Sequence, residues 1–330
     1  MPKYPLTTEE GDELFHVRKA FIPTDQGKPT GYNSIWYCDL SQVELRVAAN
    51  YTLLISTGDE NLCRAYMPFK CKHYKTGERY DHRNKEHRSR WNELKPGHPD
   101  PSQFEDGIED VLKQGWSVWV DEEGNPWVPT DVHSETTKNA YHISEDHPEF
   151  KKLRGKGKST NFLCLYGGGP AALADSLDIS FEEAKKLYEG YKAAFPMLDL
   201  YSQVVMREHR KHGYVANMYG RRYYLRNPND AYKLANYLIQ GTCADDMKRI
   251  IIEVDKLLIE GGYKSRLILT IHDEIQIELW KGEEHIIPKI LDIMGNIEWS
   301  FVPIISDAEV TYTNWAEAKT ANLDKLKKGV

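Results

Sequence analysis

The segment 267–279, with the sequence LILTIHDEIQIEL, constrains the fold of this 330-residue chain more than any other stretch of it. Apolar residues alternate with other residues on both sides of a polar triplet, His272, Asp273 and Glu274. This period-two alternation predicts a β-hairpin, and we expect both of its apolar strands to be buried. Acids at a hairpin tip are more often solvated turn residues than catalysts, so the triplet indicates chemistry only if another part of the chain supplies a partner.

The segment 34–49, SIWYCDLSQVELRVAA, supplies a second acid in a similar setting. Residues 35–38 predict a short strand that ends at Asp39, and a helical pattern begins at Glu44. A carboxylate at a strand end is fixed by the sheet yet open to solvent, which suits a metal ligand, although Asp at this place also fits a helix N-cap. Two such carboxylates, Asp39 and Asp273, can share a pair of Mg²⁺ ions, because Mg²⁺ prefers oxygen ligands and two ions stabilise phosphoryl transfer.

The segment 154–169, RGKGKSTNFLCLYGGG, contains the cations that a phosphoryl-transfer site requires. Two cations and then two aromatics recur every four residues, so they share one stripe of a predicted helix. These residues are Arg154, Lys158, Phe162 and Tyr166. Cations neutralise a triphosphate, and an aromatic ring stacks on a sugar or a base. Taken alone, the segment is better explained as an ordinary amphipathic helix with both aromatics in the core.

Composition bounds the class of protein. An apolar content of 40% with 11% aromatic residues fits a globular protein. No apolar run is long enough to span a bilayer. The five scattered cysteines are typical of free thiols in a cytoplasmic protein. The net charge of −7 argues against a generic nucleic-acid binder, but residues 70–90 carry eight basic against three acidic residues and residues 151–158 carry five basic residues. Either cluster is equally well explained as a solvated surface, yet a basic face can coexist with a net acidic chain, because salt screens distant charges.

Together, and in this order, the three segments resemble the three motifs of family A DNA polymerases, the bacterial DNA polymerase I type. The matching stretches are DLSQVELR at 39–46, the run from Arg154 to Gly167, and HDE at 272–274, with further agreement in VRKAF at 17–21, DVHSET at 131–136, YGRRYYL at 219–225 and NYLIQGTCADDMK at 236–248. The resemblance runs from about residue 5 to residue 318. It implies an α+β fold, a right-hand polymerase palm built on an antiparallel sheet with mostly helical fingers.

The resemblance also implies a domain organisation. Residues 1–50 would form the first part of the palm, residues 51–227 the fingers, and residues 228–330 the second part of the palm with the catalytic hairpin. An insertion at 67–130 would interrupt the fingers.

The function that the resemblance implies is template-directed DNA synthesis, the addition of deoxynucleotides to a primer 3′-hydroxyl by two-metal-ion phosphoryl transfer. Asp39 and Asp273 would be the catalytic carboxylates, with Glu274 in a supporting role. The metal ligands for two Mg²⁺ ions would be Asp39, Asp273 and the carbonyl of Leu40. The expected partners are primer–template DNA and deoxynucleoside triphosphates, and no membrane.

The same resemblance assigns the binding residues. Arg154, Lys158 and His133 would contact the triphosphate. Phe162 would sense the 3′ side of the sugar, Tyr166 would stack near the templating base, and Glu44 would exclude a ribose 2′-hydroxyl. The residues implied to bind DNA are Arg18, Asn236 and Gln240, with His272 at the primer terminus.

Some features depart from the family pattern. Gly155 and Gly157 occupy helical positions at a cost of about 0.5–1 kcal/mol each relative to Ala, so we expect the first turn of that helix to be loose. Tyr232 stands where many relatives have an Arg near the primer–template. The insertion 67–130 contains a predicted hairpin around EEGN at 122–125 and would grip template or a partner protein. A zinc site there is a weaker hypothesis, because its Cys and His residues fit no standard spacing: Cys63, Cys71, His73, His82 and His87.

Family members carry a thumb before the point at which Met1 falls. We therefore expect the thumb to be absent from this chain and to come from a second polypeptide, with or without an exonuclease, in a split polymerase of a phage that acts in the bacterial cytoplasm. The alternatives are a stand-alone minimal enzyme, an expressed fragment, a non-catalytic replisome scaffold and a single-subunit RNA polymerase. Glu44 and the HDE triplet favour deoxynucleotides over ribonucleotides.

Overall fold

The computed structural model describes residues 6–7, 13–15, 17–25, 31–88, 105–114 and 118–323. The chain divides into two compact units. One contains residues 1–43, 244–298 and 304–330, and we call it the sheet unit; the other contains residues 44–243 and 299–303, and we call it the helical unit. The chain passes between these units at 43/44, 243/244, 298/299 and 303/304, and the division at 50/51 and 227/228 that the resemblance implies stays a prediction.

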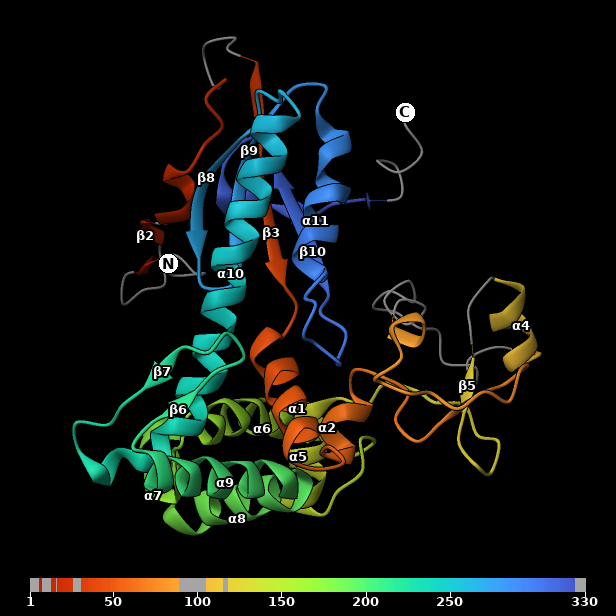
Figure 1. Ribbon diagram of the computed structural model, residues 1–330, viewed down its shortest axis with the longest axis vertical. Coiled ribbons are helices and arrows are strands. Elements are labelled where there is room, and N and C mark those ends of the chain that lie inside the picture. Colours follow the sequence, from red (N-terminus) through yellow and green to blue (C-terminus); the bar gives the residue numbers. More distant parts are fainter. Residues whose placement is uncertain are drawn as a thin grey trace. The chain divides into compact units, whose positions relative to one another are not determined.

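The sheet unit is built on a five-stranded antiparallel sheet with the strand order β11-β10-β3-β9-β8 (Figure 1). The strands are β3 Tyr32–Leu40, β8 Arg266–Ile271, β9 Glu274–Trp280, β10 Ser306–Thr311 and β11 Lys319–Thr320. Strand β3 lies at the centre of the sheet, where its apolar residues Ile35, Trp36 and Cys38 are almost fully buried. A mixed fold of helices and an antiparallel sheet confirms the expected α+β class.

The predicted hairpin is formed by β8 and β9, but only one of its strands is buried. In β9 both faces are buried, including Gln276 and Glu278, whereas β8 alternates between exposed and half-buried residues. The expectation of two buried strands is therefore wrong for β8. The reason is that β8 lies at the edge of the sheet, a position that the local alternation does not encode.

Short elements complete the sheet unit. They are β1 Leu6–Thr7, β2 Glu13–Phe15, η1 Val17–Ala20, η4 Glu284–Ile286, α11 Ile287–Gly295 and η5 Trp315–Glu317. Helix α11 packs on β3 and β10 through a fully buried side that includes Ile290 and Met294. Trp315 stacks on Tyr37 at a ring-centroid distance of 5.3 Å, which anchors η5 against β3.

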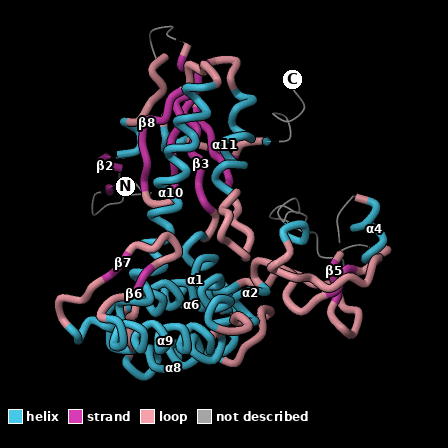
Figure 2. Tube along the Cα trace, viewed as in Figure 1, coloured by secondary structure: helices cyan, strands magenta, loops and turns pink. Residues whose placement is uncertain are grey.

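The helical unit gathers most of the helices (Figure 2). These are α1 Val43–Ile55, α2 Glu60–Arg64, α5 Val132–Tyr141, α6 Phe150–Leu165, α7 Pro170–Leu177, α8 Phe181–Ala194 and α9 Pro196–His212, followed by β6 Val215–Ala216, β7 Arg222–Tyr223, η3 Pro228–Lys233 and the start of α10 Leu234–Glu260. Helix α5 packs against both α6 and α8. Gly190 makes the second contact possible, because a Cβ there would lie 2.6 Å from the Cα of Ala140.

The glycines of α6 lie in the body of the helix. Helix α6 begins at Phe150, so the placement of Gly155 and Gly157 in its first turn is wrong. Gly157 is buried against α5, where a Cβ would overlap the Thr137 hydroxyl and lie 2.9 Å from the His133 carbonyl oxygen. Gly155 faces open space. The close approach of α5 and α6 therefore explains Gly157 but not Gly155.

The described part of the insertion contains β4 Lys72–His73, α4 Ile108–Lys113 and β5 Trp119–Val120, and β4 pairs with β5. The predicted hairpin is confirmed by a bridge from Val120 to Pro126 and by a hydrogen bond from Trp127 N to Trp119 O. His87 is buried, with Nε2 2.9 Å from Glu78 and Nδ1 accepting from Asp81 N, so both ring nitrogens already have protein partners.

Two further findings concern the described ranges as a whole. None of their His, Cys, Asp and Glu side chains form a group of three or more that could hold a metal ion, so the zinc hypothesis finds no support. No helix within them combines the length and apolarity needed to cross a bilayer.

Candidate active site

The sheet unit brings three of the predicted acids together at one end of its central strands. Asp39 is the penultimate residue of β3 and lies opposite Glu274 of β9 on one side and Asp307 of β10 on the other. Asp273 lies in the two-residue turn between β8 and β9, and its carbonyl oxygen accepts a hydrogen bond of 3.1 Å from Leu40 N. Strand pairing therefore places residues that are more than 230 positions apart in the chain side by side.

Burial raises the pKa of all three acids, and neighbouring acids add to the shift at Asp39 and Glu274. Desolvation of the carboxyl group is the largest cause that raises the pKa of Asp39 to about 7, and repulsion from Asp273, Glu274 and two acids of β10 adds to it, although the residue keeps exposed surface. Burial also raises the pKa of Asp273 and of Glu274. The cluster concentrates negative charge that a cation would stabilise.

The donor set fits Mg²⁺. The carboxylates of Asp39 and Asp273 are hard oxygen ligands, and a divalent cation would offset the repulsion that raises the pKa of Asp39. Mg²⁺ commonly takes one or two carboxylates together with water and substrate phosphates, so it does not need a third protein side chain. The side chain of Leu40 is fully buried, which fixes its backbone beside the two acids.

Two expected DNA contacts lie in the sheet unit. His272 is exposed at the hairpin turn with φ of 54°, a left-handed conformation that is uncommon for a residue other than glycine. Such a strained residue at a turn often marks a functional position. The guanidinium of Arg18 stacks over Trp315 at 4.2 Å, and its charge lowers the pKa of Glu274 against the larger effect of burial.

The helical unit carries the cationic stripe on α6. Arg154, Lys158 and Phe162 follow one another along this helix, and Tyr166 is its C-cap residue. Arg154 forms a bidentate pair with Asp131, from Nε to Oδ1 at 3.1 Å and from Nη2 to Oδ2 at 2.5 Å. Lys158 is exposed, and no hydrogen bond or ion pair of its side chain is found among the described residues.

Phe162 and Tyr166 of α6 form a row of rings with His133 of α5. The ring of His133 lies 5.8 Å from that of Phe162, and Phe162 lies 6.5 Å from Tyr166. The hydroxyl of Tyr166 donates a hydrogen bond of 2.6 Å to Glu44 Oε2 and also contacts Gln240. The helical unit thus brings together five residues to which the resemblance assigned nucleotide or DNA contacts. Asn236 is buried on α10, and its Oδ1 has no hydrogen-bond partner within the described residues.

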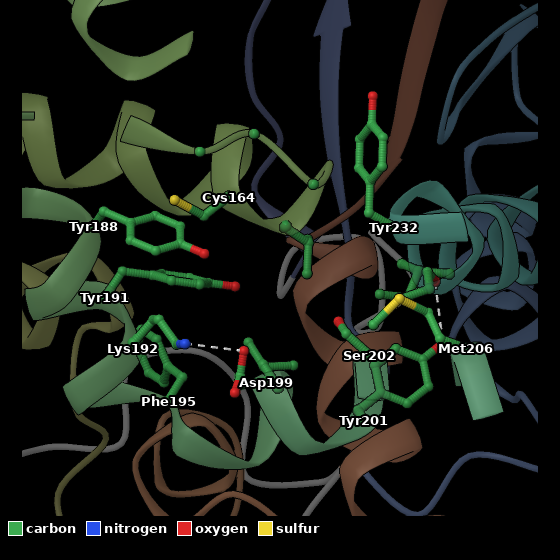
Figure 3. Close-up of a pocket in the computed structure, with 17 residues that line it drawn as sticks. Cys164, Tyr188, Tyr191, Lys192, Phe195, Asp199, Tyr201, Ser202, Met206 and Tyr232 are labelled. Atoms are coloured by element: carbon green, nitrogen blue, oxygen red, sulfur yellow. Dashed lines mark hydrogen bonds and ion pairs between the residues drawn. The ribbon is translucent and has the colours of Figure 1, made fainter. Parts of the chain in front are cut away.

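A cavity of about 220 Å³ is lined in part by the glycine turn 167–169 that follows α6. Figure 3 shows side chains that surround it. Tyr188 and Tyr191 project into it from α8, and Tyr232 lies on the opposite wall. Lys192 and Asp199 form an ion pair of 3.2 Å at its lower side. The exposed Tyr232 also packs on Gly167, where a Cβ would lie 2.9 Å from its ring.

Sequence reasoning missed Asp131 and Asn161. Asp131 caps α5 through a hydrogen bond from Ser134 N and pairs with Arg154, which lowers its pKa against the effect of burial. An Asp three residues before Ser134 is an N-cap signal, so the cap could have been predicted. Asn161 is fully buried between α5 and α6, and its only signal is a polar residue on the apolar side of a helix.

The geometry can be compared with known proteins. The model of the family described as DNA polymerase family A matches residues 126–317. DNA polymerase I of Streptococcus pneumoniae serotype 4 is 34% identical over 199 residues, which are 57% of this chain and 23% of that protein. The DNA polymerase of Mycobacterium phage D29 is 34% identical over 193 residues, 56% of this chain and 29% of that protein. DNA polymerase I of Mycobacterium bovis is 27% identical over 310 residues, 91% of this chain and 26% of that protein.

A solved structure agrees with these relatives. The POL domain of Pol1 from M. smegmatis, in complex with DNA primer-template and dNTP, superposes with a TM-score of 0.63 at 26% identity. The match covers 95% of this chain and 44% of that one. The chain spans about a quarter of the length of the curated relatives it matches.

Proposed function

Because this chain belongs to DNA polymerase family A, we propose that it takes part in template-directed DNA synthesis by adding deoxynucleotides to a primer 3′-hydroxyl. The observation that carries the proposal is the convergence of Asp39, Asp273 and Glu274 at the end of the central strands of the sheet unit. Asp39 and Glu274 lie on paired strands, and the hydrogen bond from Leu40 N holds the turn that carries Asp273, so the acids are held more rigidly than residues of an unpaired loop would be.

Asp39 and Asp273, with the Leu40 carbonyl, would hold two Mg²⁺ ions. Bound Mg²⁺ would lower the pKa of the primer hydroxyl and stabilise the charge on the triphosphate and the departing pyrophosphate. Glu274 lies opposite Asp39 in the β3–β9 pair, where its charge would support the cluster without ligating a metal.

Arg154, Lys158 and His133 would bind the phosphates of the incoming nucleotide. Arg154 would exchange Asp131 for phosphate oxygens, because both partners offer the two oxygens that a guanidinium binds in parallel. Lys158, which is exposed, would add a point charge.

The sugar and the template would be read by the remaining residues of the helical unit. Phe162 would contact the sugar and Tyr166 the templating base, while the Glu44 carboxylate, fixed by the Tyr166 hydroxyl, would exclude a 2′-hydroxyl. Asn236 and Gln240 would donate to minor-groove acceptors that all correct base pairs share. Arg18 and His272 would contact the primer–template from the sheet unit. The second polypeptide with a thumb stays a prediction.

The experiment removes one carboxylate at a time. Asp39→Asn and Asp273→Asn should each reduce primer extension by about a thousandfold, equivalent to about 4 kcal/mol of transition-state stabilisation, while DNA binding persists. Asp307→Asn is the matched control, because it removes the same charge from the residue opposite Asp39 in β10. We expect this control to retain activity within about threefold. Extension at the wild-type rate by either Asp39→Asn or Asp273→Asn would refute the assignment.

A further inference from the structure

Asn161 joins α6 to the first turn of α5 with its whole amide group. Its Nδ2 lies 3.1 Å from the carbonyl oxygen of Val132 and 3.0 Å from Nδ1 of His133, and its Oδ1 lies 2.5 Å from the hydroxyl of Thr136. The side chain has no exposed surface. Every polar atom of this amide is therefore engaged with α5.

These contacts decide which way the amide faces. A peptide carbonyl oxygen can only accept a hydrogen bond, so the group that faces Val132 must be the NH₂ of Asn161. The hydroxyl of Thr136 donates to Oδ1, which agrees with this orientation. The second N–H of the amide then points at His133, and an N–H cannot accept. Nδ1 of His133 must consequently offer its lone pair, and the ring proton must lie on Nε2.

The tautomer of His133 decides which ring nitrogen can donate a hydrogen bond, because the ring is neutral. Burial, opposed by Asp131 and reinforced by Arg154 and Lys158, lowers the pKa of His133 to about 4. The imidazole is neutral at physiological pH, so only one of its nitrogens can donate. A phosphate oxygen accepts hydrogen bonds, so the ring can serve a nucleotide only through a protonated Nε2.

We propose that Asn161 is a positioning residue for the incoming nucleotide: it locks His133 as the Nε2–H tautomer, so that the neutral ring offers one N–H to a phosphate oxygen. The role in binding rests on the proposed function, which gives His133 a phosphate contact. The tautomer itself does not rest on it.

Nitrogen-15 NMR of the histidine-labelled chain tests the tautomer directly. His133→Gln identifies the resonances of this ring among the 12 histidines. We expect Nε2 to show the shift and coupling of a protonated nitrogen and Nδ1 those of an unprotonated one. Protonation of Nδ1 in the wild-type chain would overturn the inference whatever the activity of the protein.

Asn161→Asp tests the binding role through a pH profile. A carboxylate at this position accepts from Nδ1, so it raises the pKa of His133 and, once the ring is neutral, keeps the proton on Nδ1 with the Nε2 lone pair facing outward. At low pH the ring of His133 in this variant carries protons on both nitrogens, so it offers an Nε2–H as the wild-type ring does. The Kd of the variant for dATP with Mg²⁺ should then match that of the wild type. It should weaken by about tenfold as pH rises and the ring loses the Nε2 proton. The wild type, measured alongside, corrects for titration of dATP and of Asp131.

Thr136→Val is the structural control, because it loosens Asn161 without changing the group that faces His133. It should keep the Nε2–H tautomer and a Kd within about threefold of the wild type. Parallel pH profiles for Asn161→Asp and the wild type would refute the positioning role. If His133→Gln leaves the Kd unchanged, the phosphate contact of the proposed function fails and the positioning role fails with it, whereas the NMR result stands on its own.

Discussion

Glu278 shows how a buried charge is satisfied in the sheet unit. It is 3% exposed, and its two oxygens accept hydrogen bonds from Thr24 N and Oγ1 and from Nε and Nη2 of Arg266. The carboxylate thereby joins the edge strand β8 to the segment that precedes β3. Because a desolvated charge is stable only with such partners, this group should matter more to folding than any exposed acid of the sheet.

Glu278→Ala should lower the free energy of unfolding by about 1–3 kcal/mol, because the hydrogen bonds to its buried carboxylate are lost while the half-exposed Arg266 is solvated by water. Urea unfolding followed by circular dichroism measures the change. Glu309→Ala removes an exposed acid from the same sheet and should change the free energy by less than about 0.5 kcal/mol. Equal effects of the two substitutions would contradict this account of Glu278.

The bond between Tyr166 and Glu44 bears on the choice of sugar. Glu44→Ala should lower the preference for deoxynucleotides over ribonucleotides by about a hundredfold, since the carboxylate would no longer fill the space of a 2′-hydroxyl. Tyr166→Phe keeps the ring but releases the carboxylate, and we expect it to lower the preference by about threefold to tenfold. Competition between dATP and ATP in single-nucleotide addition provides the measurement. An unchanged preference in Glu44→Ala would remove Glu44 from sugar selection.

At the scale of elements, local patterns predicted the parts of the site but not their mutual contacts. The hairpin at 267–279, the strand before Asp39 and the four-residue repeat of α6 all follow from the spacing of side chains within one element. The edge position of β8 depends on which strands pair across the sheet. The pairing of Asp131 with Arg154 depends likewise on how α5 packs against α6. The spacing of apolar residues within one helix does not encode that packing.

The two glycines of α6 provide a matched test of the approach of α5 and α6. Gly155→Ala should raise the free energy of unfolding by about 0.5–1 kcal/mol, because it adds a better helix former in open space. Gly157→Ala should lower it by about 1–3 kcal/mol, because the new methyl group would collide with Thr137 and the His133 carbonyl. Thermal and urea unfolding of both variants measure the two changes in the free energy of unfolding. The same sign for both substitutions would mean that the helices can separate at little cost.

At the scale of the whole molecule, each unit is assembled from separate stretches of chain, and the helical unit even includes residues 299–303. Asn50 explains this excursion. Its Oδ1 accepts from Phe301 N and Val302 N at 2.7 and 3.1 Å, and its Nδ2 donates to Ser300 Oγ. Neither Asn50 nor this late segment stood out in the sequence, because a satisfied buried amide has no periodic signature.

Asn50→Ala should therefore release the segment 299–303 from the helical unit. Hydrogen exchange at the amides of Phe301 and Val302 should accelerate by about tenfold, since both lose their acceptor. The amide of Ile277 in β9 should keep its protection, and it serves as the internal reference. Acceleration everywhere would instead indicate global destabilisation.

Asp131 both caps α5 and pairs with Arg154, so deleting its side chain removes both interactions at once. A variant without that side chain frees the guanidinium of Arg154 but also leaves the first turn of α5 uncapped, and this turn presents His133. Serine at this position separates the tasks, because its single oxygen still accepts from Ser134 N but cannot hold a guanidinium with two parallel bonds. To raise the affinity for nucleotides, Asp131→Ser is therefore a better first substitution than any change to Arg154 or Lys158.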